Sequence, residues 1–400
     1  MSRFFSDRAR GMKASDIREL LELTQKPEII SLAGGLPNPA AFPADEISEI
    51  CTEILKNDSH KCLQYCATEG IRPLRMALLD YMKDQLHVGG EVNNVIVTTG
   101  SQQALSLISS VLLNPGDLIL TTAPSYVGGL GAFRMFQAEM EAVDQDDGGL
   151  VVDSLSEKLA SLKAEGRKPK MIYVVPTFQN PAGVTMSEKR REDMLELAIE
   201  YDVLILEDDP YSRLRFEGED VRPVKYFDYE SRVIFLGTMS KLLSPGLRVA
   251  WIHAPKDLAR KFAIAKQSAD LCSTTFSQYI AYEFMDRGLL MPHIEKIKTM
   301  YKRKKDIMME AMGEYFPEGL TWTKPEGGMF TWVTLPEHMD SRLILMRAIK
   351  EYNVAFVIGG AFYFDGTGSN HMRLNFSHSS DDLITEGIKR LGATLKKEME

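Results

Sequence analysis

The chain has 400 residues, of which 44% are hydrophobic and 26% are charged, and these are ordinary values for a globular protein with one large and one smaller domain. They exclude global disorder and collagen-like repeats. The formal net charge of −9 argues against general binding to nucleic acid or anionic membranes, because both begin with a basic surface, so we expect small molecules as partners.

The chain shows no pattern that predicts secretion or membrane insertion. Four cysteines are too few for a disulfide framework and favour a reducing compartment. Residues 1–15 lack the apolar core of a secretory signal and predict a surface arm. Residues 92–116 are uncharged, but the polar run at 98–103 disfavours a membrane span. We therefore predict a cytoplasmic protein.

The middle of the chain alternates short β-branched apolar runs with helical patterns. This alternation predicts an α/β fold in which a mostly parallel sheet is covered by helices on both faces. A first strand at residues 95–97 is followed by a helix at 103–113. Further strands are predicted at residues 118–120, 171–175, 203–206, 233–236 and 247–252.

The pattern changes after this region. From about Phe276 to Phe316 it is helical and rich in charged residues and methionine, which predicts one long connecting helix. A smaller α+β part follows, with a closing helix after Ser379. Its other predicted elements are a strand at 329–334, a helix at 341–351, and strands near Val354 and at 372–376.

Polar side chains that suit one cofactor follow the predicted strands. Ligands of open α/β sheets bind beyond the carboxyl ends of the strands, and a helix start there can bind an anion. A phosphorylated aromatic aldehyde would use a lysine for a Schiff base, a carboxylate on its ring nitrogen and an anion cradle on its phosphate. We therefore predict pyridoxal 5'-phosphate as the cofactor, and no metal site, because the histidines show no ligand spacing. The residues at these strand ends are Ser101, Gln102, Asn180, Asp208, Tyr211, Thr238, Ser240, Lys241 and Arg248.

Four segments carry a resemblance to a known family. They resemble the fold-type I, class I/II aminotransferases, and the likeness runs from about Ile29 to the C-terminus. Residues 15–20, 31–37 and 63–65 are similar to the branch that contains 2-aminoadipate (LysN-type), kynurenine and archaeal aromatic aminotransferases. The four segments are Gly100-Ser101-Gln102-Gln103, Asn180-Pro181-Ala182-Gly183, Glu207-Asp208-Asp209-Pro210-Tyr211, and Ser240-Lys241 through Arg248.

The resemblance implies an architecture. It implies a seven-stranded type of sheet sandwiched by helices, with a smaller α+β domain formed by both chain termini. On this basis we expect an N-terminal arm at 1–41 that belongs to the small domain, a large cofactor-binding domain at 42–287, and a small C-terminal domain at 288–400. The resemblance also implies a homodimer with shared active sites, in which Tyr65 reaches the phosphate in the neighbouring subunit.

The resemblance further assigns roles in catalysis. Lys241 would form the Schiff base and move the substrate proton, and Asp208 would keep the ring nitrogen protonated. Asp209 is the alternative, but the family's carboxylate lies three residues before the tyrosine, as Asp208 lies before Tyr211. Tyr211 and Asn180 would hydrogen-bond the phenolic oxygen of the cofactor.

Other residues would hold the two ligands. Tyr126 would stack on the cofactor ring, while Arg373 would bind the substrate carboxylate and Gly35 would let the backbone approach the substrate. Arg18 either contacts the distal group of the substrate or is an exposed helical arginine, and the sequence leaves both interpretations open. The phosphate would be held by Ser101, Gln102, Thr238, Ser240 and Arg248.

These features imply a reaction. The resemblance implies an aminotransferase that moves the α-amino group of an aromatic, kynurenine or 2-aminoadipate type amino acid to 2-oxoglutarate by a ping-pong mechanism. One alternative is another fold-type I enzyme, a decarboxylase, lyase or synthase, because the same lysine and cofactor support those reactions. A less favoured alternative is a cofactor-binding regulator domain, since no DNA-binding helix-turn-helix region fits before Ser31.

Overall fold

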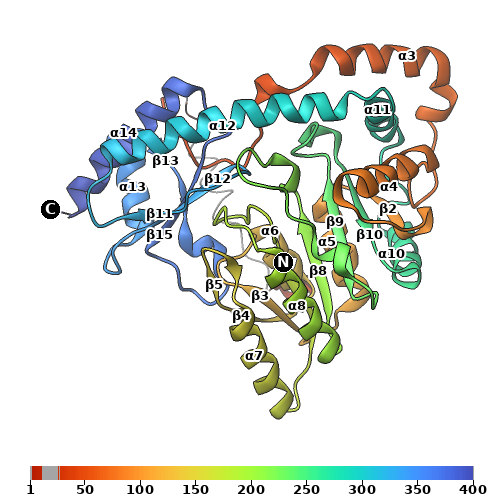
Figure 1. The fold of residues 1–400 in the computed structure, drawn as a ribbon, viewed down its shortest axis with the longest axis horizontal. Coiled ribbons are helices and arrows are strands. Elements are labelled where there is room, and N and C mark those ends of the chain that lie inside the picture. Colours follow the sequence, from red (N-terminus) through yellow and green to blue (C-terminus); the bar gives the residue numbers. More distant parts are fainter. Residues whose placement is uncertain (1, 11–25, 27, 400) are drawn as a thin grey trace.

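A seven-stranded sheet forms the centre of the computed structural model, which describes residues 2–10, 26 and 28–399 (Figure 1). Six strands are parallel and β10 is antiparallel to both of its neighbours. This confirms the predicted α/β fold with a mostly parallel sheet. The spatial order is β2 (Val95–Thr99), β10 (Val249–His253), β9 (Val233–Thr238), β8 (Leu204–Asp209), β7 (Pro169–Val174), β3 (Leu118–Thr122) and β4 (Glu139–Val143).

Helices cover both faces of this sheet because successive side chains of its strands point to opposite faces. Ile119 of β3 belongs to the main core, whereas Leu118 and Leu120 pack into a second core on the other face. The second core is covered by α7 (Val152–Ala164) and α8 (Glu188–Glu200). The main core is covered by α4 (Arg72–Leu86), α5 (Ser101–Leu112), α6 (Val127–Met135), α10 (Lys256–Ala269) and α11 (Thr275–Asp286).

Smaller sheets join the two ends of the chain. A four-stranded antiparallel sheet contains β11 (Thr321–Trp322), β12 (Phe330–Thr334), β15 (His371–Asn375) and β14 (Val357–Ile358), in that order. Next to the C-terminal elements, β1 (Ile30–Ser31) pairs in parallel with β13 (Val354–Ala355). The N-terminal segment therefore folds together with the C-terminal third of the chain, as expected. The domain boundaries themselves stay predictions.

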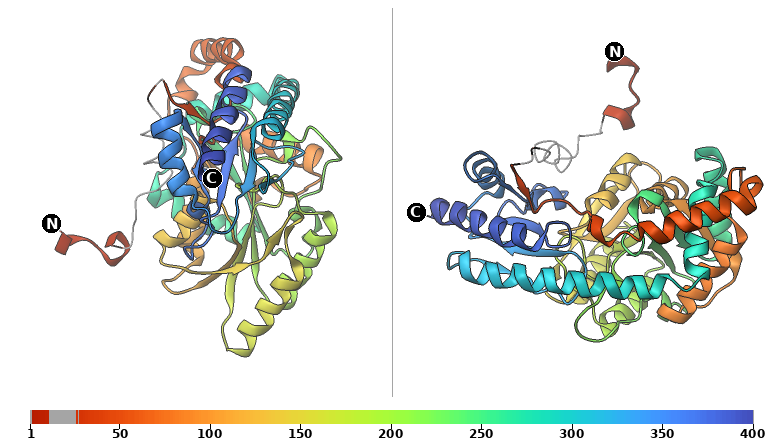
Figure 2. Two further views of the ribbon diagram at one scale, coloured as in Figure 1. Left: turned by 90° about the vertical axis from the view of Figure 1, so that its left-hand side faces the viewer. Right: turned by 90° about the horizontal axis from the view of Figure 1, so that it is seen from above.

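Long helices connect and complete these layers. The helix α12 (Leu290–Tyr315) lies beside the closing helix α14 (Asp381–Met399), as seen from above in Figure 2. No helix in the described ranges is both long and apolar enough to span a membrane. The remaining helices and strands are α1 (Asp7–Arg10), α3 (Ala44–Cys62), β5 (Gln145–Asp146), β6 (Gly149–Leu150), α9 (Val224–Phe227) and α13 (Ser341–Tyr352).

Two of the differences from the sequence-based expectations have a clear physical reason. The single helix expected from about 276 to 316 is two helices, α11 and α12, separated at Gly288, whose φ of +69° is incompatible with a continuous right-handed helix. The strand β4 was not predicted. It lies at the edge of the sheet, is only partly buried and carries Glu139 and Glu141, so it lacks the apolar run of the central strands.

Candidate active site

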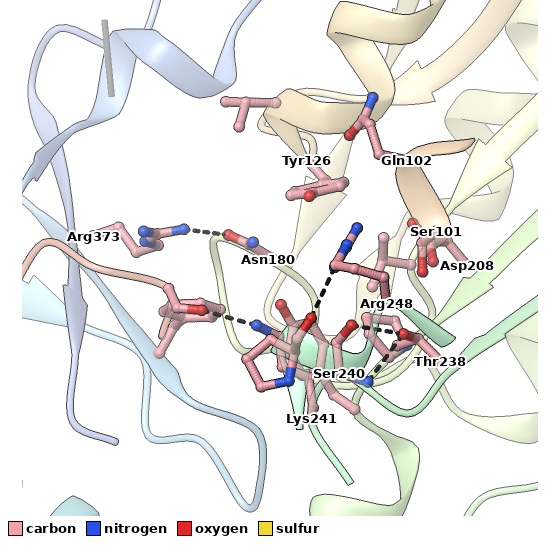
Figure 3. A pocket seen from close by; sticks show the side chains of 17 residues that line it. Ser101, Gln102, Tyr126, Asn180, Asp208, Thr238, Ser240, Lys241, Arg248 and Arg373 are labelled. Atoms are coloured by element: carbon pink, nitrogen blue, oxygen red, sulfur yellow. Dashed lines mark hydrogen bonds between the residues drawn. The ribbon is translucent and has the colours of Figure 1, made fainter. Parts of the chain in front are cut away.

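A cavity of about 300 Å³ lies at the carboxyl ends of the central strands (Figure 3). The other side of the cavity is formed by Gly35 from the N-terminal segment and by Phe330 and Arg373 of the smaller sheet. The structure therefore brings residues from the whole chain to one site. The predicted site residues that line it are Gly35, Ser101, Gln102, Tyr126, Asn180, Asp208, Tyr211, Thr238, Ser240, Lys241, Arg248 and Arg373.

One predicted residue that the structure describes does not line this cavity. The side chain of Tyr65 is 75% exposed and does not line it. Arg18 lies outside the described residues, so its two interpretations stay open. Five lining residues were not predicted: Val127, Val175, Pro210, Pro245 and Phe330.

One end of the cavity is suited to an anion. The helix α5 begins there at Ser101, and the first amide groups of a helix have no partners within it. The guanidinium of Arg248 lies against this turn, with Nη2 3.5 Å from the Thr99 carbonyl oxygen. A Cβ at Gly100 would come within 2.0 Å of Nη2, and the φ of Gly100 is +77°, so only glycine fits here.

Two hydroxyl groups complete this end. The Thr238 hydroxyl lies 3.0 Å from the Ser240 hydroxyl and accepts a hydrogen bond from the Ser240 backbone N–H at 3.1 Å. Thr238 is the last residue of β9 and Ser240 lies in the turn that follows, and both side chains line the cavity. Hydroxyls, helix amides and one guanidinium together are a suitable donor set for a phosphate dianion.

An ion pair between Asp270 and Lys266 supports the turn between β2 and α5. Asp270 accepts hydrogen bonds from Gln103 Nε2 at 2.6 Å and from Thr99 Oγ1 at 3.2 Å, and it pairs with the fully buried Lys266 ammonium at 2.6 Å. These contacts tie the end of α10 to the turn between β2 and α5. They fix the backbone that forms the anion end of the cavity.

A buried carboxylate lines the cavity. Asp208 is the fifth residue of β8, and its Oδ2 accepts a hydrogen bond of 2.9 Å from the Tyr173 hydroxyl. Burial raises the pKa of Asp208 to about 7, although the Tyr173 hydrogen bond lowers it. Asp209 does not line the cavity, and its carboxylate accepts a hydrogen bond from the Ser212 backbone N–H instead. The geometry therefore favours Asp208 over Asp209 as the carboxylate that meets a ligand.

Lys241 brings its amine into the same space. Its Nζ donates a hydrogen bond of 2.8 Å to the carbonyl oxygen of Gly35. Burial, together with the positive charges of Arg373 and Arg248, lowers its pKa to about 8. At pH 7 about a tenth of this amine is therefore neutral, far more than for an ordinary lysine, and the neutral amine is the form that attacks an aldehyde.

Arg373 forms the opposite wall of the cavity. Its two terminal nitrogens donate hydrogen bonds of 2.8 Å each, to Asn180 Oδ1 and to the Ala33 carbonyl oxygen. The guanidinium lies over the rings of Phe330 and Phe362, at 4.2 and 5.1 Å from their centroids. Its Nε is buried and has no hydrogen-bond partner among the described residues. Such a fixed and incompletely satisfied cation is suited to binding a carboxylate.

Two tyrosines line the cavity between these ends. Tyr211 is buried, packs its ring edge to face with Phe330 and lies near the Asn180 amide. Burial raises the pKa of Tyr126 to about 12, so this phenol stays neutral. The ring of Tyr126 faces the cavity beside Asn180 and Arg248 in Figure 3.

Sequence reasoning missed Tyr173 and Phe330, which contact Asp208 and Arg373. Both residues lie inside predicted strands, where an aromatic side chain is expected to pack in the core. The available signal was alternation: Tyr173 is buried in the main core between Ile172 and Val174, which face the second core. That signal gives the face of the sheet, but it does not identify the partner on the neighbouring strand.

The donors in the cavity fit pyridoxal 5'-phosphate. The anion end suits its phosphate, the Asp208 carboxylate suits a protonated ring nitrogen, and Lys241 suits its aldehyde. Fold and site thus define an α/β enzyme that holds this cofactor at the carboxyl ends of its strands. Within the described ranges, no group of three or more His, Cys, Asp or Glu side chains could hold a metal ion.

Comparisons with known proteins agree with this class. The family described as aminotransferase class I and II matches residues 34–391. The chain belongs to this family: it is an aminotransferase that acts on amino acids and depends on pyridoxal 5'-phosphate. This finding confirms the resemblance seen in the sequence.

Three similar proteins illustrate the relationship. Aromatic-amino-acid aminotransferase 1 of Thermococcus litoralis is 50% identical over 398 residues, which cover 100% of this chain and 95% of that protein. The structure of Pyrococcus horikoshii kynurenine aminotransferase in complex with PMP is 49% identical, has a TM-score of 0.97 and covers 100% of this chain and 98% of the other. LysN, the α-aminoadipate aminotransferase of Thermus thermophilus, complexed with N-(5'-phosphopyridoxyl)-L-leucine, is 36% identical with a TM-score of 0.92 and the same coverage.

Proposed function

We propose that the enzyme transfers the α-amino group of an aromatic, kynurenine or 2-aminoadipate type amino acid to 2-oxoglutarate by a ping-pong mechanism. The observation that carries this proposal is the presence of Lys241, Asp208 and Arg373 around one cavity. An amine that can move a proton, a carboxylate for the cofactor ring and a cation for the substrate carboxylate are the groups that this reaction needs. The names of the similar proteins support the class of donor.

Arg373 and Asn180 would orient the substrate. The planar guanidinium is held in place by Asn180, the Ala33 carbonyl and two aromatic rings, so it can bind a carboxylate in a fixed direction. A fixed carboxylate limits the rotation of the substrate Cα–H bond before proton removal.

Lys241 would move the proton at the substrate Cα. When bound, the cofactor supplies an electron-withdrawing pyridine ring that accepts the electron pair left on Cα. The lowered pKa of Lys241 makes its neutral amine available as the base near pH 7, and the Gly35 carbonyl holds that amine by a hydrogen bond. The same ammonium can then return the proton to the other carbon of the reacting system.

The remaining residues would bind the cofactor. Tyr126 would stack on its ring, Tyr211 and Asn180 would hydrogen-bond its phenolic oxygen, and Asp208 would hold the proton on its ring nitrogen. The phosphate would be held by Ser101, Gln102, Thr238, Ser240 and Arg248.

The residues available to contact the substrate side chain favour an aromatic donor. Of the described residues, Lys241, Arg248 and Arg373 are the cations that line the cavity. Each already has a proposed role, with the reacting proton, the cofactor phosphate and the substrate α-carboxylate respectively. Val127 and Phe330 add an apolar and an aromatic surface. A second carboxylate on the substrate would therefore need a cation from elsewhere, and Arg18 stays a candidate for that role.

We further propose that the active enzyme is a homodimer in which Tyr65 contacts the phosphate in the neighbouring subunit. Leu63 and Tyr65 are 69% and 75% exposed, and Leu271 is 50% exposed. These apolar side chains belong to adjoining segments, because Cys66 Sγ lies 3.7 Å from the Ser273 carbonyl oxygen. Exposed apolar side chains that cluster in this way are typical of a protein interface. The cytoplasmic location stays a prediction.

A donor panel tests the proposed reaction. Aromatic amino acids, kynurenine, 2-aminoadipate and alanine would be offered with 2-oxoglutarate, and glutamate formation would be measured. We expect the aromatic donors to react with the highest kcat/KM. The Lys241→Ala variant should form no glutamate above background, and a variant with normal turnover would contradict the assignment of Lys241.

A half-reaction separates transfer from the alternative reactions of the cofactor. Mixed with an aromatic amino acid and no keto acid, the enzyme should convert one cofactor equivalent per site to its amine form and then stop. Continued product formation would instead support a decarboxylase, lyase or synthase.

A further inference from the structure

Tyr173 donates a hydrogen bond to the carboxylate that would hold the cofactor ring. We propose that Tyr173 is a positioning residue, which orients Asp208 and keeps it ionised so that the ring nitrogen of the cofactor retains its proton. The inference rests on the proposed role of Asp208, and it gives a function to a side chain that does not line the cavity.

The topology of the sheet places the two residues together. The strands β7 and β8 are parallel neighbours in which Tyr173 is opposite Leu206. Asp208 follows Leu206 by two positions, so it points to the same face of the sheet as Tyr173. A tyrosine is long enough to reach the next residue along that face, and its hydroxyl lies 2.9 Å from Asp208 Oδ2.

The Tyr173 ring is fixed by its surroundings. The side chain is fully buried and packs edge to face on Phe133, with centroids 5.1 Å apart. The helix α6 passes close above it, because a Cβ at Gly129 would lie 2.7 Å from carbon atoms of the ring and 2.9 Å from its hydroxyl oxygen. The absence of a side chain at this helical position leaves the space that the phenol occupies.

The direction of the hydrogen bond does not change with pH in the working range. Burial and the charge of Asp208 raise the pKa of Tyr173 well above its ordinary value, so the phenol remains a donor. A donor to the carboxylate favours its ionised form, whereas burial alone disfavours that form. Within the described part of the chain, this is the one side-chain hydrogen bond to Asp208, which leaves its other oxygen for a ligand in the cavity.

Loss of this bond has a consequence that can be measured without a catalytic assay. A less stable Asp208 anion would hold the proton on the cofactor ring less tightly. A proton on the ring disfavours a second positive charge at the linkage between the cofactor and Lys241. Weaker ring protonation should therefore raise the pH at which the visible absorption of the bound cofactor changes.

The first test is Tyr173→Phe in the cofactor-loaded enzyme. This change keeps the buried ring and removes only the donor. We expect the pH midpoint of the change in visible absorption to rise by about 0.5 pH unit or more. Because one hydrogen bond to a charged group is lost, kcat should fall about 3- to 10-fold, while the KM for the amino donor should stay within about twofold of wild type. The control is Tyr301→Phe, which removes another buried phenol, one that accepts a hydrogen bond from the Asn38 backbone N–H rather than donating one to Asp208.

A second pair of variants covers the case in which Tyr173→Phe does not fold. Gly129→Ala would displace the Tyr173 ring and should shift the midpoint in the same direction. Gly131→Ala lies in the same helix, meets nothing within 4 Å and should leave the midpoint unchanged.

The outcomes are separable. Midpoints that shift for Tyr173→Phe and Gly129→Ala, but not for Tyr301→Phe and Gly131→Ala, support the inference. A wild-type midpoint in Tyr173→Phe with kcat within twofold of wild type, or an equal shift in both tyrosine variants, would overturn it. A wild-type enzyme that neither absorbs as a bound cofactor nor transfers an amino group would overturn the proposed function instead.

Discussion

The ionisable residues of the cavity are arranged for ligands that carry charge. Burial lowers the pKa of Arg373 to about 10 and, with the neighbouring cations, that of Lys241 to about 8. Burial raises the pKa of Asp208 to about 7. Each of these groups is disfavoured in its charged form until an opposite charge arrives. A phosphate, a substrate carboxylate and a protonated ring nitrogen would supply those charges, so ligand binding should stabilise the folded protein.

At the residue scale, Asp208 should make the stability of the cofactor-free enzyme depend on pH. Its folded pKa of about 7 is above the unfolded value of about 3.9, so its stabilising contribution is present below the unfolded value and is lost as the pH rises through 7. Asparagine does not ionise. Between pH 5 and pH 8, the cofactor-free Asp208→Asn variant should therefore gain roughly 1 to 4 kcal/mol in unfolding free energy relative to wild type.

Urea unfolding of both cofactor-free proteins at the two pH values measures this difference. The neighbouring carboxyls Glu207 and Asp209 also have raised pKa values and are present in both proteins, and the charge of Asp209 is itself one cause of the raised pKa of Asp208. The cofactor should reverse the order at pH 8, because it gives the ionised Asp208 a partner in the wild type alone. A stability difference that does not change with pH would contradict the assignment of a buried carboxyl group with a raised pKa.

At the scale of elements, the turn between β2 and α5 forms the anion end because a strand, a glycine and a helix start meet there. Gly100 has a φ of +77°, and Gly116, in the turn after α5, has a φ of +83°. Alanine at either position adds backbone strain of about 1 kcal/mol. Only at Gly100 would the new methyl group also meet Arg248.

The Gly100→Ala variant should therefore bind pyridoxal phosphate at least about 10-fold more weakly, since a charge-assisted hydrogen bond to the phosphate is disturbed. Its affinity for pyridoxal, which lacks the phosphate, should change much less. Gly116→Ala is the matched control and should bind both compounds as wild type does. Titration of the cofactor-free proteins, followed by visible absorption, gives the affinities, and equal losses in the two variants would count against a phosphate site at this turn.

The sequence predicts such turns well because their requirements are local. A glycine followed by a helix start, or a lysine after a short apolar strand, is visible in a few adjacent residues. Tyr173 and Phe330 could not be assigned in this way, since their partners lie on other strands and depend on register. The edge strand β4 was missed because partial exposure removes the apolar run, and the break at Gly288 was missed because the helical pattern continues on both sides of it.

At the scale of the whole molecule, the cavity is complete only when both chain ends fold against the central sheet. The Gly35 carbonyl binds Lys241, and the pairing of β1 with β13 brings that segment beside the C-terminal elements. Asn38 strengthens this closure, since its side chain donates to the Ser377 carbonyl. The family resemblance implied that both termini would contribute, but residues that reach the site from a second subunit require an assembly and remain proposals.

Shared active sites predict complementation between two defective subunits. Tyr65→Ala should weaken binding of pyridoxal phosphate in the neighbouring site, while Lys241→Ala disables the site of its own subunit. A hybrid of the two variants would contain one site with both defects and one intact site. In a twofold dimer with random subunit exchange, half of the dimers are hybrids, so an equal mixture should recover about a quarter of wild-type activity at limiting cofactor.

The assay would compare the mixture with each variant alone and would monitor the mass of the particle by light scattering. Tyr229→Ala is the matched control: this tyrosine is also exposed and its hydroxyl bonds Glu196, so its loss should leave cofactor affinity unchanged. A monomeric active enzyme, or a mixture no more active than the sum of its parts, would show that each subunit builds its site alone.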